Sequence, residues 1–240
     1  MLRFYRGIAV PEDEWGSLAH DIRVNGLRAT DQTTWQVEVV DLRAHLEHLF
    51  AKPGLSLSDT RPSELVTTDR GSHRRLLGAV PALCACGDEL GGTYYATRHN
   101  RTSGKTAPLL VCFEADVGDV QIDGKDFMHN PMFQTGCTQG QRDWMIRIFG
   151  QVVERYVERA WLPDKKLDYR LALCDLAAQD PQVICDHHRN EIVLGGRCGT
   201  IFRSAFNVRL PVAPARIVEV TRPVGVIPKP NFTIEDFKRA

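Results

Sequence analysis

The chain has 240 residues, and its 30 acidic residues cancel its 30 basic residues, so its net charge gives no reason to expect a nucleic-acid or membrane partner. A hydrophobic content of 43% and a charged content of 25% are those of an ordinary soluble globular protein. No apolar run approaches transmembrane length, and the N-terminus has no apolar signal-peptide core. The length, with no low-complexity linker, predicts a single domain over residues 1–240.

The seven cysteines are odd in number and scattered, and most stand in apolar strings such as residues 110–113 and 173–174. This pattern is typical of reduced thiols in a protein core rather than of a disulfide framework. We therefore expect a cytoplasmic protein.

The first 27 residues predict a strand, a turn and a short helix. Residues 2–10 have strand composition and end at Pro11, after which three acidic residues favour a helix N-terminus. The helix that follows has apolar residues at helical spacing from Trp15 to Ile22. The pair Asn25-Gly26 predicts its end.

The next segments predict a second amphipathic helix and a polar loop. Residues 40–51 have the helical pattern, and Pro53-Gly54 ends it. Residues 55–78 read as a loop, with the densest basic cluster of the chain at 70–75. Such a cluster is usually a solvated surface, but near a site it would favour contact with phosphates.

The segment Gly91-Gly92-Thr93-Tyr94-Tyr95-Ala96-Thr97 predicts a short strand with a glycine-lined mouth. Glycine lets a ligand approach the backbone, and tyrosine offers a flat face for stacking. Alternation along a strand would send the two tyrosines to opposite sides. The alternative to a ligand-binding role is a purely structural one, in which a Gly-Gly turn precedes a core strand with structural tyrosines.

The remaining elements predict an α+β protein. Residues 109–115 and 120–123 read as strands, 126–140 as a loop, and 141–161 as the longest helix. The last third has strand composition throughout, and its predicted strands are 168–173, 182–185, 191–194, 201–208 and 217–221. Helices and strands thus follow one another without a regular βαβ alternation.

Two familiar motifs are incomplete. Ser103-Gly104-Lys105-Thr106 resembles the end of a P-loop, but His99 stands where that motif needs its first glycine. The segment also lacks the strand and helix that would flank a phosphate-binding loop. The sequence therefore does not predict a P-loop.

A zinc site has equally weak support. One residue separates Cys84 from Cys86, whereas zinc sites favour two to four, and Cys185, His187 and His188 lie far along the chain. Core thiols and surface histidines explain these residues as well. Cys185 near His187 is also the only candidate for an activated cysteine by sequence, and the signal is weak.

Four short motifs, taken in order along the chain, resemble the ADP-ribosyltransferase superfamily, which includes bacterial toxins and poly-ADP-ribose polymerases. Phe4-Tyr5-Arg6-Gly7 resembles the first-strand arginine motif of the arginine-type toxins. Residues 15–27 resemble the short helix and Asn-Gly-Leu ending that follow that strand. Residues 92–97 resemble the Gly-x-Tyr-Phe-Ala motif of the polymerases, and residues 190–193 resemble the strand that the catalytic glutamate opens.

The resemblance implies a split mixed or antiparallel sheet with flanking helices, and NAD as the substrate that is cleaved. Arg6, Tyr94 and Glu191 should then line one cleft. Glu191 would stabilise the oxocarbenium-like transition state or hold the ribose 2′-hydroxyl. Tyr94 would stack on nicotinamide, and Arg6 would hold ribose or pyrophosphate. The backbone of Gly7 would bind the nicotinamide amide.

The resemblance also implies further NAD-binding residues. Gly92 and Thr93 precede the stacking tyrosine, and Arg98 follows it in a position to meet phosphate. The chain departs from the arginine-modifying branch because Arg189 stands two places before Glu191, where those toxins have Glu or Gln, and because the Ser-Thr-Ser motif is missing. These departures favour an acceptor other than arginine.

The predicted function is therefore NAD-dependent mono-ADP-ribosyl transfer to a nucleic-acid base or a protein side chain, in a bacterial toxin or defence effector with an antitoxin or regulatory partner and no membrane partner. A small-molecule acceptor stays open. Two other functions also stay open: NAD hydrolysis to water, and a non-catalytic α+β module that binds nucleic acid. An RNA 2′-phosphotransferase shares the ancestry, but its set of phosphate-binding arginines has no counterpart here.

Overall fold

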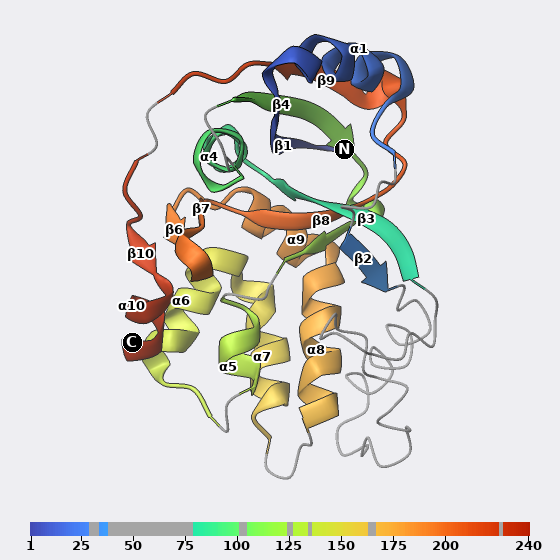
Figure 1. The fold of residues 1–240 in the computed structure, drawn as a ribbon. Coiled ribbons are helices and arrows are strands. Elements are labelled where there is room, and N and C mark those ends of the chain that lie inside the picture. Colours follow the sequence, from blue (N-terminus) through green and yellow to red (C-terminus); the bar gives the residue numbers. More distant parts are fainter. Residues whose placement is uncertain are drawn as a thin grey trace.

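A computed structural model of the protein (Figure 1) describes residues 1–28, 34–37, 79–100, 105–123, 127–133, 136–162, 167–225 and 228–240. The helix expected at residues 40–51 and the loop expected at 55–78 lie outside the described residues. No helix in the described part of the chain combines the length and the apolar character that crossing a membrane requires.

The centre of the described chain is a seven-stranded sheet in which every pairing is antiparallel. Its strands are β1 (Leu2–Pro11), β2 (Thr34–Val37), β3 (Ala79–Cys86), β4 (Thr106–Ala115), β5 (Val120–Ile122), β8 (Ala205–Arg209) and β9 (Ile217–Thr221). Six strands follow the order β5-β8-β3-β1-β4-β9, and β2 pairs with β3 beside this path. Helices and an antiparallel sheet thus agree with the predicted α+β class, and the strands predicted at 2–10 and 217–221 are confirmed.

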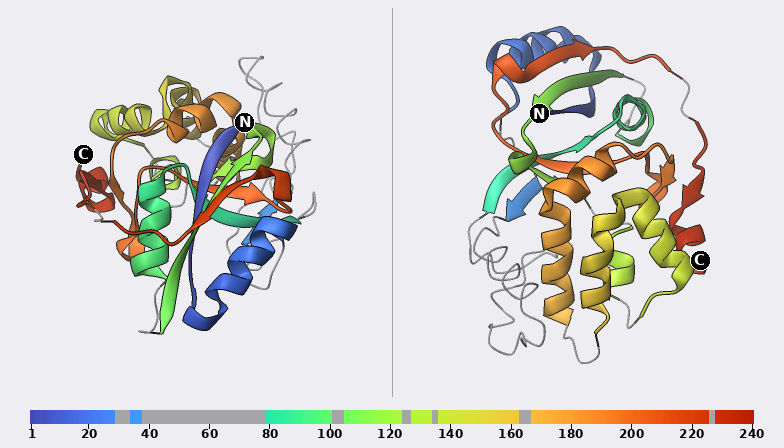
Figure 2. Two further views of the ribbon diagram at one scale, coloured as in Figure 1. Left: turned by 90° about the horizontal axis from the view of Figure 1, so that it is seen from above. Right: turned by 180° about the vertical axis from the view of Figure 1, so that it is seen from behind.

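Helices lie at both ends of this sheet (Figures 1 and 2). Helix α1 (Trp15–Asn25) lies against β9 at one end, and Gly26 with φ +74° ends it, as the sequence predicts. The other end carries α5 (His129–Phe133), α6 (Gln139–Phe149), α7 (Glu154–Ala160), α8 (Leu167–Gln179) and α9 (Pro181–His188). Helix α4 (Glu89–Tyr94) lies beside the middle of the sheet.

The helix predicted at 141–161 is two helices, α6 and α7, with a 3₁₀ turn between them. A capping box of Thr138 and Gln141 starts α6, and Gly150 with φ +82° ends it. A Cβ atom at Gly150 would lie 2.2 Å from Asp186 Oδ2, so the break is also a close contact with α9. The loop predicted at 126–140 contains α5.

Two segments predicted as strands, 168–173 and 182–185, are the helices α8 and α9. Helix α9 begins at a common N-terminal capping signal, although its residues have the composition of a strand. The Asp180 side chain accepts hydrogen bonds from Gln182 N and Val183 N, and Pro181 occupies the first turn. In α8 the residues from Leu173 to Ala178 are all buried, so tertiary packing outweighs the local alternation.

A second, three-stranded sheet holds the C-terminus. It contains β6 (Leu194–Gly195), β7 (Ile201–Phe202) and β10 (Phe232–Thr233), followed by α10 (Ile234–Arg239). Phe232 stacks on Trp144 of α6 with 3.6 Å between the ring centroids, which anchors this tail. The strand predicted to open at Glu191 opens at Leu194 instead, and the one predicted at 201–208 is divided between β7 and β8.

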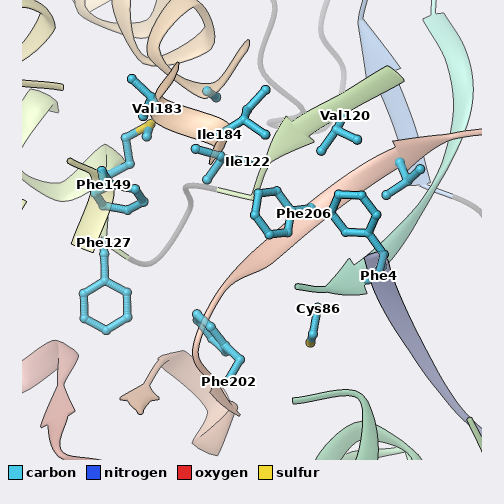
Figure 3. Packing of buried hydrophobic residues seen from close by; sticks show 14 of the residues in the cluster. Phe4, Cys86, Val120, Ile122, Phe127, Phe149, Val183, Ile184, Phe202 and Phe206 are labelled. Atoms are coloured by element: carbon cyan, nitrogen blue, oxygen red, sulfur yellow. The ribbon is translucent and has the colours of Figure 1, made fainter. Parts of the chain in front are cut away.

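The hydrophobic core joins the sheet to the helices α5–α9 (Figure 3). Phe4 of β1 meets Phe206 of β8 edge to face, with 5.2 Å between the ring centroids. Val183 and Ile184 of α9 lie on the far side of Phe206, fully buried. This core therefore holds the strands β1, β8 and β5 in a fixed arrangement around the site described next.

Candidate functional site

The strands β1 and β3 separate in the middle of the sheet. In the described chain they pair at one position, Tyr5 opposite Cys86, although β1 stays paired with β4 over its whole length. The other end of the same β3 edge, Ala79–Ala82, pairs with β2. Residues 83–85 of β3 and 6–9 of β1 therefore face one another across a gap (Figure 1).

The gap is a cleft with a volume of about 590 Å³. Its walls are residues 5–9 of β1, residues 84–86 of β3, Ala205 and Phe206 of β8, Asp123 after β5, and three residues that follow α4. A cleft of this size lies within the range of small-molecule binding sites, roughly 300–1,000 Å³.

Arg6 crosses the cleft. Its side chain is half-buried, and Nη1 donates a hydrogen bond of 2.7 Å to the Cys84 carbonyl oxygen on the opposite strand. A guanidinium group carries five N–H donors in a fixed fork. Arg6 can therefore hold the two strands together and still present donors to an anionic ligand.

Gly7 places backbone groups in the cleft. Asn100 Nδ2 donates to the Gly7 carbonyl oxygen at 3.0 Å, from the cleft side of β1. The N–H and C=O groups of one strand residue point to the same side, so the Gly7 N–H also faces the cleft. A Cβ atom at Gly7 would lie 1.9 Å from the Gly92 carbonyl oxygen and 2.7 Å from Ala96 N. The glycine is therefore needed for the packing of β1 against the helix.

The segment 91–97, predicted as a strand, is helical. Asp88 caps α4 by accepting a hydrogen bond from Gly91 N, and a π-helical segment, η3 (Tyr95–His99), continues α4. A Cβ atom at Gly92 would lie 2.7 Å from Leu110 Cδ1, so the glycine pair lets this helix approach the sheet closely. Packing against β1 and β4 therefore outweighs the strand propensity of the neighbouring residues.

The helical conformation also decides which tyrosine faces the cleft. Tyr95 lines it, together with His99 and Asn100, and the Tyr95 and His99 rings meet edge to face at 5.0 Å. The Tyr94 hydroxyl instead donates to the Gly199 carbonyl oxygen, and burial raises the Tyr94 pKa above its ordinary value. The aromatic wall of the cleft is thus Tyr95, next to the tyrosine predicted from sequence.

The other predicted residues are not among the described residues that line the cleft. Gly92 and Thr93 are buried residues of α4, and Arg98 is exposed on η3. Glu191 is exposed in the segment between α9 and β6. The structure thus brings Arg6 and Gly7 into the cleft, while Tyr94 and Glu191 are not among the described residues that line it.

Cys86 lines the cleft near charged groups of both signs. Burial raises the pKa of the Cys86 thiol well above its ordinary value, chiefly through desolvation. The negative charges of Asp88 and Asp123 add to this rise, whereas the positive charge of Arg6 opposes it. Cys86 therefore stays a neutral thiol, and the charged side chains among the described residues that line the cleft are Arg6 and Asp123.

The residues that the sequence did not indicate are Tyr95, His99, Asn100 and Asp123. The first three depend on the helical turn after α4, and Asp123 depends on the long-range pairing of β5 with β8. The cleft thus combines a guanidinium group, a carboxylate, an aromatic pair and a backbone amide. No protein-family model matches the chain, and no curated protein or solved structure matches it either.

Proposed function

We propose that the chain is an NAD-dependent mono-ADP-ribosyltransferase and that NAD binds in the cleft between β1 and β3. The observation that carries this proposal is the divergence of the two strands beside Arg6 and Gly7. A split sheet and a first-strand Arg-Gly pair are what the sequence resemblance implies. The same two residues line the cleft described above.

The chemistry of the cleft fits the parts of NAD. The pyrophosphate is a double anion, and an arginine fork binds such groups through charge-assisted hydrogen bonds, as Arg6 would here. The nicotinamide ring is flat and carries a positive charge, which suits the face of the Tyr95 ring. Its carboxamide needs backbone partners, and the Gly7 N–H and C=O both face the cleft.

The proposed reaction breaks the bond between the nicotinamide nitrogen and C1′ of the ribose. The bonding electron pair leaves with nicotinamide, and positive charge develops on the ribose. A nucleophile of the acceptor then bonds to C1′ and loses its proton to a base or to water. A carboxylate near the ribose can stabilise that charge, and electrostatic stabilisation of this kind is usually the largest single contribution to catalysis.

We propose a macromolecular acceptor, a nucleic-acid base or a protein side chain, which suits a toxin or defence effector controlled by an antitoxin. Radiolabelled NAD incubated with the protein and with DNA, RNA or a protein extract identifies the acceptor by the fraction that retains the label. Release of nicotinamide with no labelled macromolecule would show instead that water is the acceptor, and the protein would be an NAD glycohydrolase.

The proposal is tested by measuring nicotinamide release from NAD by the wild-type protein and by Arg6→Ala. We expect the variant to lose at least tenfold in kcat/KM, because each tenfold step corresponds to about 1.4 kcal/mol and a lost charged hydrogen bond costs about that or more. Arg3→Ala is the matched control, since Arg3 lies on the same strand but is exposed and pairs with Glu114 on the surface. Background release by the wild-type protein would contradict the proposal.

NAD binding without turnover would favour the alternative of a binding module. Calorimetry with NAD and the wild-type protein separates these two outcomes. Thermal unfolding of Arg6→Ala checks that the variant still folds after its bond to the Cys84 carbonyl is lost.

A further inference from the structure

Asp123 lines the same cleft as Arg6 but comes from another part of the sheet. It follows β5, and its N–H donates a 2.9 Å hydrogen bond to the Ala205 carbonyl oxygen. Strand β5 pairs with β8 from Val120 to Ile122, so two neighbouring strands fix the backbone at Asp123. Its side chain is half-buried and lines the cleft.

The support for Asp123 is rigid. The Ala205 N–H donates to Nε2 of the buried His187, and His187 packs on the Phe206 ring at 5.3 Å. The Ala205 carbonyl on the next peptide unit then receives the Asp123 N–H. A carboxylate whose backbone is fixed by paired strands is better positioned than one on an exposed loop.

The neighbouring carboxylates of Asp88 and Glu191 are not among the described residues that line the cleft. Asp88 accepts hydrogen bonds from the backbone N–H groups of Gly91, Arg203 and Ser204, which is the role of a structural cap. Glu191 is exposed between α9 and β6. Among the described residues that line the cleft, Asp123 is the one carboxylate.

We propose that Asp123, rather than Glu191, is the carboxylate that stabilises the positive charge on the ribose when the nicotinamide bond of NAD breaks. This inference rests on the proposed function. The C1′–N bond breaks, the electron pair leaves with nicotinamide, and the Asp123 carboxylate faces the cationic sugar without forming a bond to it. The acceptor nucleophile then bonds to C1′ and releases its proton.

Arg6 and Asp123 together explain why a ligand with both charges would suit the cleft. NAD carries negative charge on its pyrophosphate and positive charge on its nicotinamide ring. The cleft offers a guanidinium group on the β1 side and a carboxylate on the β8 side. The charge of Asp123 would therefore act chiefly on the ring and the ribose, where positive charge develops.

The test compares the steady-state kinetics of nicotinamide release for Asp123→Asn, Asp123→Glu, Glu191→Gln and a control. Removal of a group that stabilises charge in a transition state typically costs 10²–10³-fold in kcat, and we expect a loss of this order for Asp123→Asn with KM changed by less than about threefold. Asp123→Glu keeps the charge, and we expect its kcat to be at least about tenfold above that of Asp123→Asn.

Asp119→Asn is the matched control. Asp119 lies just before the same strand, and its exposed carboxylate pairs with Arg209 at 3.7 Å, outside the cleft. We expect its kinetic constants to stay at the wild-type values. Thermal unfolding and NAD binding of Asp123→Asn show whether that variant retains the native fold.

Two results would overturn the assignment of Asp123. One is wild-type turnover by Asp123→Asn, and the other is a comparable loss confined to Glu191→Gln, which would make Glu191 the carboxylate. In both cases the wild-type protein still releases nicotinamide, so the proposed function stands. If the wild-type protein neither binds nor cleaves NAD, the proposed function fails and the role of Asp123 fails with it.

Discussion

The two edges of β1 are used in different ways. Along one edge, β1 pairs with β4 from Leu2 to Pro11, so ten residues contribute to a continuous ladder. Along the other, the described chain pairs β1 with β3 at Tyr5 alone. One strand thus supplies stability through its paired edge, while residues of its open edge line the cleft.

An open edge inside a folded domain needs partners for its backbone groups, because buried N–H and C=O groups are costly without hydrogen bonds. Here side chains supply part of what a neighbouring strand would have supplied. Arg6 reaches across to the Cys84 carbonyl, and Asn100 donates to the Gly7 carbonyl. A ligand can replace side-chain hydrogen bonds of this kind without unfolding the sheet. The backbone hydrogen bonds of a strand pair cannot be replaced in this way unless the strands separate.

The largest effect should come from the paired edge. Phe113 of β4 stands opposite Phe4 in the ladder and is fully buried, with 6.0 Å between the two ring centroids. Truncation of such a ring typically costs 3–5 kcal/mol, and we expect Phe113→Ala to lower the free energy of unfolding by roughly this amount. Urea denaturation measures it.

Glu114→Ala is the control on the same strand. Its carboxylate makes a surface pair with Arg3 at 3.3 Å, and such pairs contribute about 0–1 kcal/mol. A loss below about 1 kcal/mol for Phe113→Ala would mean that the paired edge does not carry the stability of this half of the sheet.

The second effect concerns His187, which accepts a hydrogen bond from the backbone of Ala205, a residue of β8 that lines the cleft. Its Nε2 accepts the Ala205 N–H at 3.3 Å, so its Nδ1 carries the proton and donates to the Ile148 carbonyl at 3.1 Å. Burial lowers the His187 pKa from 6.5 to about 4, the charge of His188 adds to this, and the bond to Ile148 opposes it. The folded protein therefore keeps this ring neutral.

The stability of the protein should fall as the ring is forced to ionise. The unfolded chain binds a proton at His187 below about pH 6.5, whereas the folded protein does so only below about pH 4, so this contribution is complete above pH 6.5 and is lost as the pH falls toward 4. The loss should reach about 3 kcal/mol. Denaturation of the wild-type protein and of His187→Asn between pH 7 and 4 measures it.

The free energy of unfolding of His187→Asn should depend much less on pH between 7 and 4 than that of the wild-type protein. His20→Asn is the control, because His20 is exposed on α1 and should leave the dependence unchanged. If wild-type and His187→Asn proteins lose stability in parallel as the pH falls, His187 is not the group responsible.

The contrast between the two edges also explains what the sequence could predict. The strand that carries Arg6 and Gly7 was predicted from its composition, and the two residues were singled out by a motif resemblance. Helix α1 was predicted because its apolar spacing and its Asn-Gly end are local signals. The helix α9 had such a signal too, in Asp180-Pro181, but a short apolar run is ambiguous between strand and helix.

The rest of the cleft depends on contacts between distant segments. Tyr95 faces the cleft only because the glycines before it let a helix approach the sheet, which strand propensity does not reveal. Asp123 reaches the cleft only because β5 pairs with β8, more than eighty residues later in the chain. No local pattern contains that register.

The smallest effect is expected for Asn100→Ala. This substitution separates the roles of the two edges of β1 most clearly, because it changes a contact on the open edge alone. Asn100 Nδ2 donates to the Gly7 carbonyl, and the carboxamide of nicotinamide is a donor of the same kind. A hydrogen bond of this type contributes about 1 kcal/mol, so Asn100→Ala should lower the free energy of unfolding by about that amount. In Asn100→Ala this hydrogen bond is already absent and does not have to be broken when NAD binds. KM for NAD should therefore fall by up to about fivefold.

Steady-state nicotinamide release and urea denaturation measure the two changes, with Asn25→Ala as the control, since Asn25 bonds to Asp21 on the exposed surface of α1. A fall in stability with a fall in KM means that Asn100 occupies the place of the ligand on the open edge. A rise in KM would mean the opposite: Asn100 would then bind NAD directly, and the Gly7 carbonyl would have to find its partner elsewhere in the cleft.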